Sequence, residues 1–205
     1  MAAILARKLG MTQRFLEDGR VERVTVLEAG PCPVTGLRTA ERDGYEAVQL
    51  AFEEIREKLI SKPEIGHLKK AGFGAHRTLV EFRGEGGELK IGDVVTAEAF
   101  EPGSQVKISG ISKGKGFAGT IKRHNFASGP KSHGSHNVRA PGSIGASATP
   151  SRVMKGIRGP GQMGSKRITQ KGLTVVEVIP SDNLLLVRGS VPGPRGGTVE
   201  VRTDA

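Results

Sequence analysis

The chain has 205 residues, a hydrophobic fraction of 36% and one cysteine, which suits a single domain or a domain with an appendage. Its 31 Lys and Arg exceed its 21 Asp and Glu, and this net charge of +10 is typical of proteins that bind nucleic acid or another polyanion. A single cysteine excludes an intramolecular disulfide. The apolar runs are too short for a membrane span. Arg7 and Lys8 interrupt the N-terminal apolar run, so a signal peptide is not expected.

Short strands joined by turns are predicted through the first half of the chain. Residues 21–27 are rich in β-branched side chains and follow the period of two of a strand, and Asp18-Gly19 just before them is a hairpin signal. Helical propensity is confined to residues 53–60 and to residues 63–71, where Gly72 is expected to end a short helix. The expected strands cover residues 3–9, 12–16, 21–27, 34–38, 45–52, 79–82 and 106–111.

The last part of the chain returns to strong strand patterns. We expect strands over residues 173–179, 184–187 and 198–202, with a turn near Pro180. Because strong strands lie at both ends of the chain, they predict a mostly β fold with one or two short helices: a small antiparallel barrel closed by its N- and C-terminal pieces. The predicted domains are a globular one over residues 1–105 and 173–205, with an α/β insertion near 53–100, and a basic looped extension over 106–172.

A stretch between Glu101 and Glu177 contains no acidic residue. Its 75 residues hold 13 Lys and Arg, 14 Gly and three of the five His. The rest of the chain then has 18 basic and 21 acidic residues, so the positive excess belongs to this acid-free stretch. Such a composition cannot bury a core of its own and favours a segment that lies against a polyanion.

Glycine motifs in the acid-free stretch suggest nucleotide binding, but their surroundings do not fit it. Residues 114–119 match G-x-G-x-x-G, yet the acidic residue needed about 20 positions later is missing. A kinase-type loop would lack its metal-holding aspartates. Residues 159–166 end in Gly164-Ser165-Lys166, whereas a phosphate loop ends in Gly-Lys followed by Ser or Thr. We expect no cofactor and no small-molecule substrate.

Hydroxyl and imidazole groups lie together at residues 132–136. A Ser–His nucleophile needs a third group to orient the base, and no carboxylate is local. His133 and His136 could share a metal, but no further ligands are evident, so we expect neither an enzyme nor a metal site. Apolar positions nevertheless recur through the stretch, which favours a segment that becomes ordered against a partner: Phe117, Ile121, Phe126, Ile144, Val153, Met154, Ile157 and Met163.

RNA is the partner that these residue types favour. Spaced cations neutralise phosphates and release counterions, glycines allow close backbone approach, and Arg and His reach bases or 2′-hydroxyls of folded RNA. The stretch has only two aromatic residues, Phe117 and Phe126, which argues against a stacking platform for single strands. No helix-turn-helix, zinc-finger or basic-zipper pattern points to DNA.

Motifs along nearly the whole chain resemble one known family. In order, the chain is similar to the bacterial large-subunit ribosomal protein L3 family at residues 4–15, 29–34, 43–50, 112–117, 122–126, 132–136, 141–145, 149–150, 155–156, 161–164, 183–187 and 191–194. Some relatives carry a methylated glutamine after Gly-Ser-Ile-Gly; this chain has Ala146-Ser147-Ala148 there, so that modification is not expected.

The resemblance implies a β-barrel of the translation-protein type and a structural role in the cytoplasmic ribosome. It also implies that the basic extension runs through large-subunit ribosomal RNA toward the peptidyl transferase centre, that the protein helps to start subunit assembly, and that other ribosomal proteins contact it. The extension tip is expected near residues 141–150, shaped by Pro141, Gly142, Ser143, Gly145, Ala148 and Pro150.

Two alternatives remain open from the sequence: an RNA chaperone that works apart from the ribosome, and an enzyme that acts on RNA. In either case the side chains expected to contact RNA are the same. They are the cations, imidazoles and amides of the extension: Lys113, Lys115, Lys122, Arg123, His124, Asn125, Lys131, His133, His136, Asn137, Arg139, Arg152, Lys155, Arg158, Lys166 and Arg167.

Overall fold

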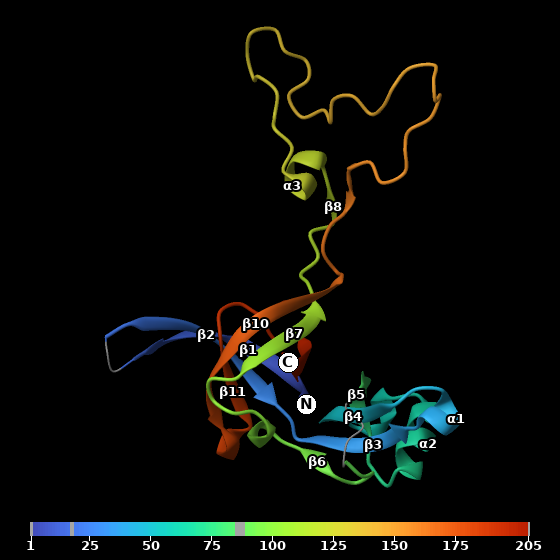
Figure 1. Cartoon of the computed structure of the whole chain (residues 1–205), viewed down its shortest axis with the longest axis vertical. Helices are drawn as coiled ribbons and strands as arrows, with labels where there is room; N and C mark the ends of the chain where they lie inside the picture. The colour runs from blue at the N-terminus through green and yellow to red at the C-terminus, as the bar shows by residue number, and fades with distance from the viewer. Residues whose placement is uncertain (1, 17–18, 85–88, 205) are drawn as a thin grey trace. The chain divides into compact units, whose positions relative to one another are not determined.

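The computed structural model describes residues 2–16, 19–84 and 89–204, so the expected turn at Asp18 lies partly outside the described residues. The chain forms two compact units (Figure 1). The globular unit contains residues 1–112 and 167–205, and the basic segment contains residues 113–166. The division of the chain at residues 106 and 172 stays a prediction.

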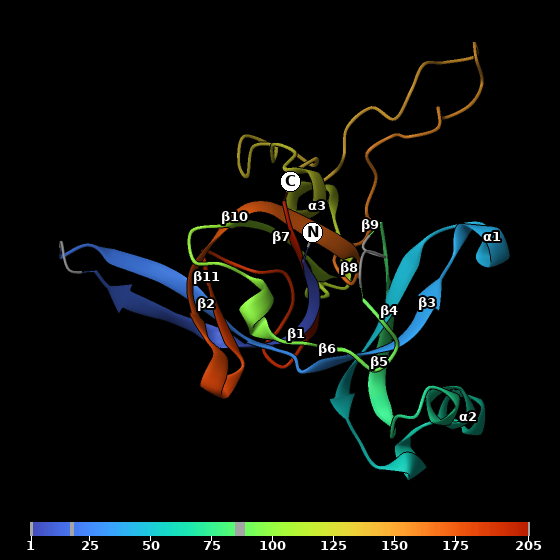
Figure 2. The same ribbon diagram turned by 60° about the horizontal axis from the view of Figure 1, so that its bottom comes forward.

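Six antiparallel strands close into a barrel in the globular unit (Figure 2). Their order around the barrel is β1-β12-β7-β10-β11-β2. The first and last strands pair, with Ala3 opposite Arg202, so the prediction of a mostly β fold with a small antiparallel barrel closed by both ends of the chain is confirmed. The bounds are β1 Ala3–Phe15, β2 Val21–Ala29, β7 Gln105–Ile111, β10 Arg167–Ile179, β11 Leu184–Arg188 and β12 Thr198–Thr203.

Gly10 does not interrupt the first strand, contrary to the prediction. Strand β1 runs continuously past it, and the pairing with β2 shifts register between Lys8 and Gly10. A glycine inside a strand commonly marks such a bulge, because the local bend needs little side-chain bulk. At the bulge the buried Lys8 donates from Nζ to the carbonyl oxygens of Val191 at 2.7 Å and Gly193 at 3.3 Å. These bonds attach the loop before β12 to the barrel.

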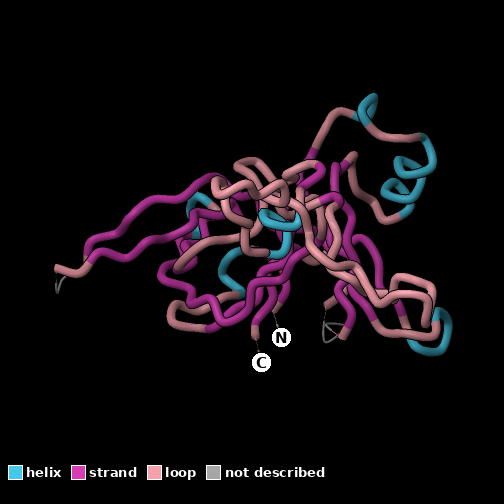
Figure 3. The backbone as a smooth tube through the Cα atoms, turned by 90° about the horizontal axis from the view of Figure 1, so that it is seen from above, coloured by secondary structure: helices cyan, strands magenta, loops and turns pink. Residues whose placement is uncertain are grey.

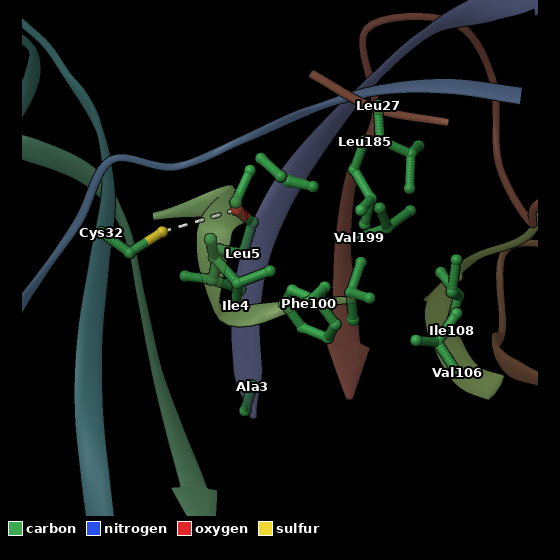
Figure 4. Packing of buried hydrophobic residues seen from close by; sticks show 14 of the residues in the cluster. Ala3, Ile4, Leu5, Leu27, Cys32, Phe100, Val106, Ile108, Leu185 and Val199 are labelled. Carbon is green, nitrogen blue, oxygen red and sulfur yellow. Dashed lines mark hydrogen bonds between the residues drawn. The ribbon is translucent and has the colours of Figure 1, made fainter. Parts of the chain in front are cut away.

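Buried side chains of the barrel strands and of neighbouring elements form the core (Figure 4). Residues 3–6 of β1 are all buried, whereas on β7 buried positions alternate. Leu5, Ile108 and Leu185 are fully buried, and Val106 and Ile108 are two apart on β7, as the period of two requires. Each such side chain contributes roughly 1.5–3 kcal/mol by leaving water.

A four-stranded sheet in the order β5-β4-β3-β6 continues the globular unit. Helix α2 (Lys62–Lys70) lies between β4 and β5 in the chain and begins with a capping box between Ser61 and Glu64. The helix expected over 53–60 is wrong: Glu53 and Glu54 belong to strand β4, and only the 3₁₀ turn Glu57–Leu59 forms after it. The other elements are β3 Cys32–Arg38, α1 Ala40–Asp43, β4 Ala47–Glu54, β5 His76–Arg83, β6 Val94–Val95, and the 3₁₀ turns Ala97–Ala99 and Pro180–Asp182. Figure 3 shows how few and short the helices are.

The sheet and the barrel share one core. Phe82 of β5 is fully buried in the same cluster as Ile4 and Val201 of the barrel. The Arg202 guanidinium lies 4.7 Å from the centre of the Phe82 ring, within the range of a cation–π contact. The globular unit is therefore one packed body, and a change at Phe82 should affect the sheet and the barrel together.

Cys32 should resist alkylation in the folded protein. Its Sγ lies buried 3.4 Å from the Leu5 carbonyl oxygen (Figure 4), and burial raises the pKa of the thiol to about 12. Since the thiolate is the nucleophile, iodoacetamide at a pH near 8.5, the usual thiol pKa, should leave the native chain unmodified. In denaturant the same reagent should modify the thiol, which intact mass detects. Rapid modification of the native chain would contradict the burial of Cys32.

The raised pKa also fixes the sign of its effect on stability. Between about 8.5 and 12 the unfolded thiol loses its proton while the folded one keeps it, so this group stabilises the fold fully below about pH 8.5 and progressively less above it.

Candidate nucleic-acid interface

The basic segment contains the whole net charge of the protein. Residues 113–166 hold 10 of the 31 Lys and Arg and none of the 21 Asp and Glu. The remaining chain has 21 basic and 21 acidic residues, and its net charge is zero. Coulomb attraction for a polyanion therefore comes from this unit, where no carboxylate opposes it.

The two ends of the basic segment run alongside each other. Strands β8 (Phe117–Ala118) and β9 (Gly161–Gln162) pair antiparallel. Two backbone hydrogen bonds continue the pairing next to these strands. The NH of Lys115 donates to the Met163 carbonyl oxygen at 2.8 Å, and the NH of Met163 donates to the Gly116 carbonyl oxygen at 2.9 Å. Gly164 has a φ of 78°, and a Cβ there would collide with the Lys113 carbonyl oxygen. Here glycine allows the chain to approach its own backbone, a use that the sequence had suggested only for phosphates.

Helix α3 (Thr120–His124) holds the returning strand in place. Arg123 donates from Nη1 to the Gly159 carbonyl oxygen at 2.7 Å, and Nε2 of His124 lies 3.0 Å from the same oxygen. The helix ends at Asn125, whose φ of 60° is the left-handed conformation common at helix C-termini. These contacts, with buried Ala118 and Thr120, order this part of the segment although it has no large core.

Every residue from 139 to 158 is exposed. The expected tip, residues 141–150, lies within this range, and its Ser143 hydroxyl donates to the Gly145 carbonyl at 3.2 Å. Just before it, Gly129 packs against the Asn137 carbonyl too closely for any Cβ. A loop with so little burial has to obtain further contacts from a partner if it is to hold one conformation.

Arg123, His124 and Arg167, which are among the predicted RNA contacts, bond other groups of the chain. Arg123 and His124 are half-buried and bond the backbone as described, and Arg167 forms an ion pair with Glu200 inside the globular unit. Whether any of these side chains contacts RNA stays a prediction. The other predicted contacts are exposed: Lys113, Lys115, Lys122, Asn125, Lys131, His133, His136, Asn137, Arg139, Arg152, Lys155, Arg158 and Lys166.

The sequence did not predict that apolar side chains of the basic segment meet around a hollow. Phe126, Ile144, Val153 and Ile157 line it together with Arg158, and its volume is ≈ 290 Å³. Their recurrence along the sequence was visible, but their spacing follows no period of a helix or strand. Only the fold of the loop brings them together.

Two other site types, a metal centre and a membrane-spanning helix, have no candidate among the residues that the structure describes. No three of its His, Cys, Asp and Glu residues are grouped as metal ligands would be. None of its helices has the length and apolar character to cross a membrane. The charge distribution and the hollow are thus the features of the basic segment that call for a function.

The chain is a β-barrel protein in which a neutral barrel unit is joined to a unit that contains all the net positive charge, a distribution typical of proteins that bind a polyanion. Residues 72–180 match the model of the family described as "Ribosomal protein L3". The chain is also 53% identical, over 204 residues, to the protein named "Large ribosomal subunit protein uL3" of Acidothermus cellulolyticus, covering 98% of this chain and 92% of that protein. The chain belongs to the ribosomal protein L3 family. Since that is a family of structural ribosomal proteins, the prediction that the chain is no enzyme is confirmed.

Proposed function

We propose that the chain is a structural constituent of the large ribosomal subunit in the cytoplasm and that its basic segment binds large-subunit ribosomal RNA. Binding early in assembly would help to nucleate the subunit. Residues 141–150 would point toward the peptidyl transferase centre, and other ribosomal proteins would contact the globular unit. The family and the name of the Acidothermus relative support the ribosomal role.

One observation supports RNA binding above all: the entire net charge of the protein lies in a segment that contains no acidic residue. Within RNA, each carboxylate would meet repulsion from phosphates, whereas each exposed cation can release a counterion. The exposed loop 139–158 has little core of its own and can adapt to a folded RNA surface.

Neutralising one exposed cation of the basic segment should weaken binding mainly at low salt. For Lys131→Gln, the slope of log affinity against log salt should decrease by roughly 0.7–0.9, the contribution of one phosphate contact. Filter binding of the full chain to large-subunit RNA over a salt series measures this slope. Lys62→Gln, an exposed lysine of α2, is the matched control and should leave the slope unchanged.

Sucrose-gradient fractionation of cells tests the ribosomal assignment. The chain should sediment with the large-subunit peak, and its absence there would favour an RNA chaperone apart from the ribosome. Variants in which several cations of residues 113–166 are neutralised should have a smaller slope of log affinity against log salt. If their slope equalled that of the unchanged chain, the basic segment would not be the part that binds the RNA.

A further inference from the structure

Apolar side chains from separate parts of the basic segment line one hollow. Its lining comes from three stretches: Phe126 directly after α3, Ile144 in the exposed loop, and Val153 with Ile157 before β9. Ile144 and Ile157 remain 55% and 49% exposed, so the hollow is open to solvent on one side. Large apolar side chains gathered around an open hollow are typical of a binding site.

One part of the lining, at Gly159, is held by hydrogen bonds. Gly159 lines the hollow, and its carbonyl oxygen accepts from Arg123 at 2.7 Å and lies 3.0 Å from Nε2 of His124. The His124 ring lies 6.0 Å from the Phe126 ring, centre to centre, at 43°. The aromatic wall and the backbone wall are therefore attached to the same short helix.

We propose that this hollow holds one unstacked base of large-subunit ribosomal RNA, an inference that rests on the proposed function. A volume of ≈ 290 Å³ lies at the lower end for small-molecule sites and suits a single heterocyclic ring system. Phe126 offers an aromatic face, and bases that leave the stack are bound on such faces and on guanidinium planes. Arg158 on the lining supplies the guanidinium and a cation for the attached phosphate.

Charge complementarity favours RNA over a protein side chain as the occupant. The lining contains Arg158 and no acidic residue, and the whole basic segment lacks Asp and Glu. An apolar anchor from a basic neighbouring protein would meet repulsion, whereas a base brings its own negative phosphate. The site would thus combine an apolar contact for the base with a Coulomb contact for its backbone.

Filling the hollow without changing the charge tests the proposal. Ile157→Trp should reduce the affinity of the full chain for large-subunit RNA by roughly 5- to 150-fold, the range expected for the loss of one base–aromatic contact. The salt slope should stay as in the unchanged chain, because no phosphate contact is removed. Chemical probing of the bound RNA should then show one unpaired nucleotide becoming reactive, and Phe126→Leu should expose the same nucleotide.

Leu59→Trp is the control, since Leu59 is a large apolar side chain that is 63% exposed and lies in the globular unit, outside the basic segment. It should leave affinity and probing pattern unchanged. If Ile157→Trp had the same affinity and the same probing pattern as the unchanged chain, the proposal would be overturned. A photocrosslinker at position 157 that reacted with a ribosomal protein in assembled subunits would also overturn it. If the unchanged chain itself showed no salt-dependent RNA binding, the proposed function would fail instead.

Discussion

Replacing residues 112–166 by Asn-Gly should remove RNA binding and leave the globular unit folded. Ile111 of β7 lies opposite Arg167 of β10, so a two-residue turn can join the two strands as a hairpin. The shortened protein has 21 basic and 21 acidic residues and no net charge. With six to ten phosphate contacts, the affinity of the full chain should fall by roughly 10³–10⁵-fold between 50 and 200 mM salt. The shortened protein should show weak binding with a slope near zero.

Filter binding to large-subunit RNA over a salt series measures both slopes. Urea unfolding of the shortened protein is the control, and its midpoint should not fall below that of the full chain, since a short turn costs less closure entropy than a long insert. Binding as tight and as salt-dependent as that of the full chain would place the RNA site on the globular unit.

Phe82→Ala should destabilise the globular unit by roughly 3–5 kcal/mol, the usual cost of removing a buried aromatic ring. The ring is 0% exposed, lies in the core cluster that the sheet shares with the barrel, and is covered by the Arg202 guanidinium. Removing the Phe82 ring leaves a cavity in the shared core and also removes the cation–π contact with Arg202. Because a domain has about 5–15 kcal/mol of stability in total, urea unfolding should show a large shift of the midpoint.

Phe15→Ala is the matched control for this substitution. Phe15 ends β1 and is 67% exposed, so the same change of residue type should alter stability by less than about 0.5 kcal/mol. Similar losses for both variants would mean that Phe82 is not part of a shared core. Two separate transitions in Phe82→Ala alone would instead show that the sheet had lost its attachment to the barrel.

Alternation of side chains was enough to predict most strands, but not their neighbours. Residues 21–27 and 173–179 were recognised because they alternate and are rich in β-branched residues. The extension of β10 back to Arg167 was missed, since its first six residues are all exposed and only pairing with β7 makes them a strand. That β12 lies between β1 and β7 depends on tertiary packing, which no local pattern records.

For the candidate site, composition identified the segment but not the geometry within it. The absence of acidic residues was visible as soon as charges were counted. However, Arg123 and His124 were grouped with the RNA contacts, and the structure shows that both bond the Gly159 carbonyl. A side chain suited to phosphate is equally suited to a backbone carbonyl, and residue type alone cannot tell which of them lies nearby.

The pairing of β1 with β12 determines the order in which the protein can fold as it is synthesised. Strand β12 lies between β1 and β7, and it is the last strand along the chain. During translation the barrel therefore stays open until residue 203 has been added, long after the basic segment has been made. Contacts so distant in sequence form slowly. A nascent chain thus presents its cations to nucleic acid before its own barrel is complete.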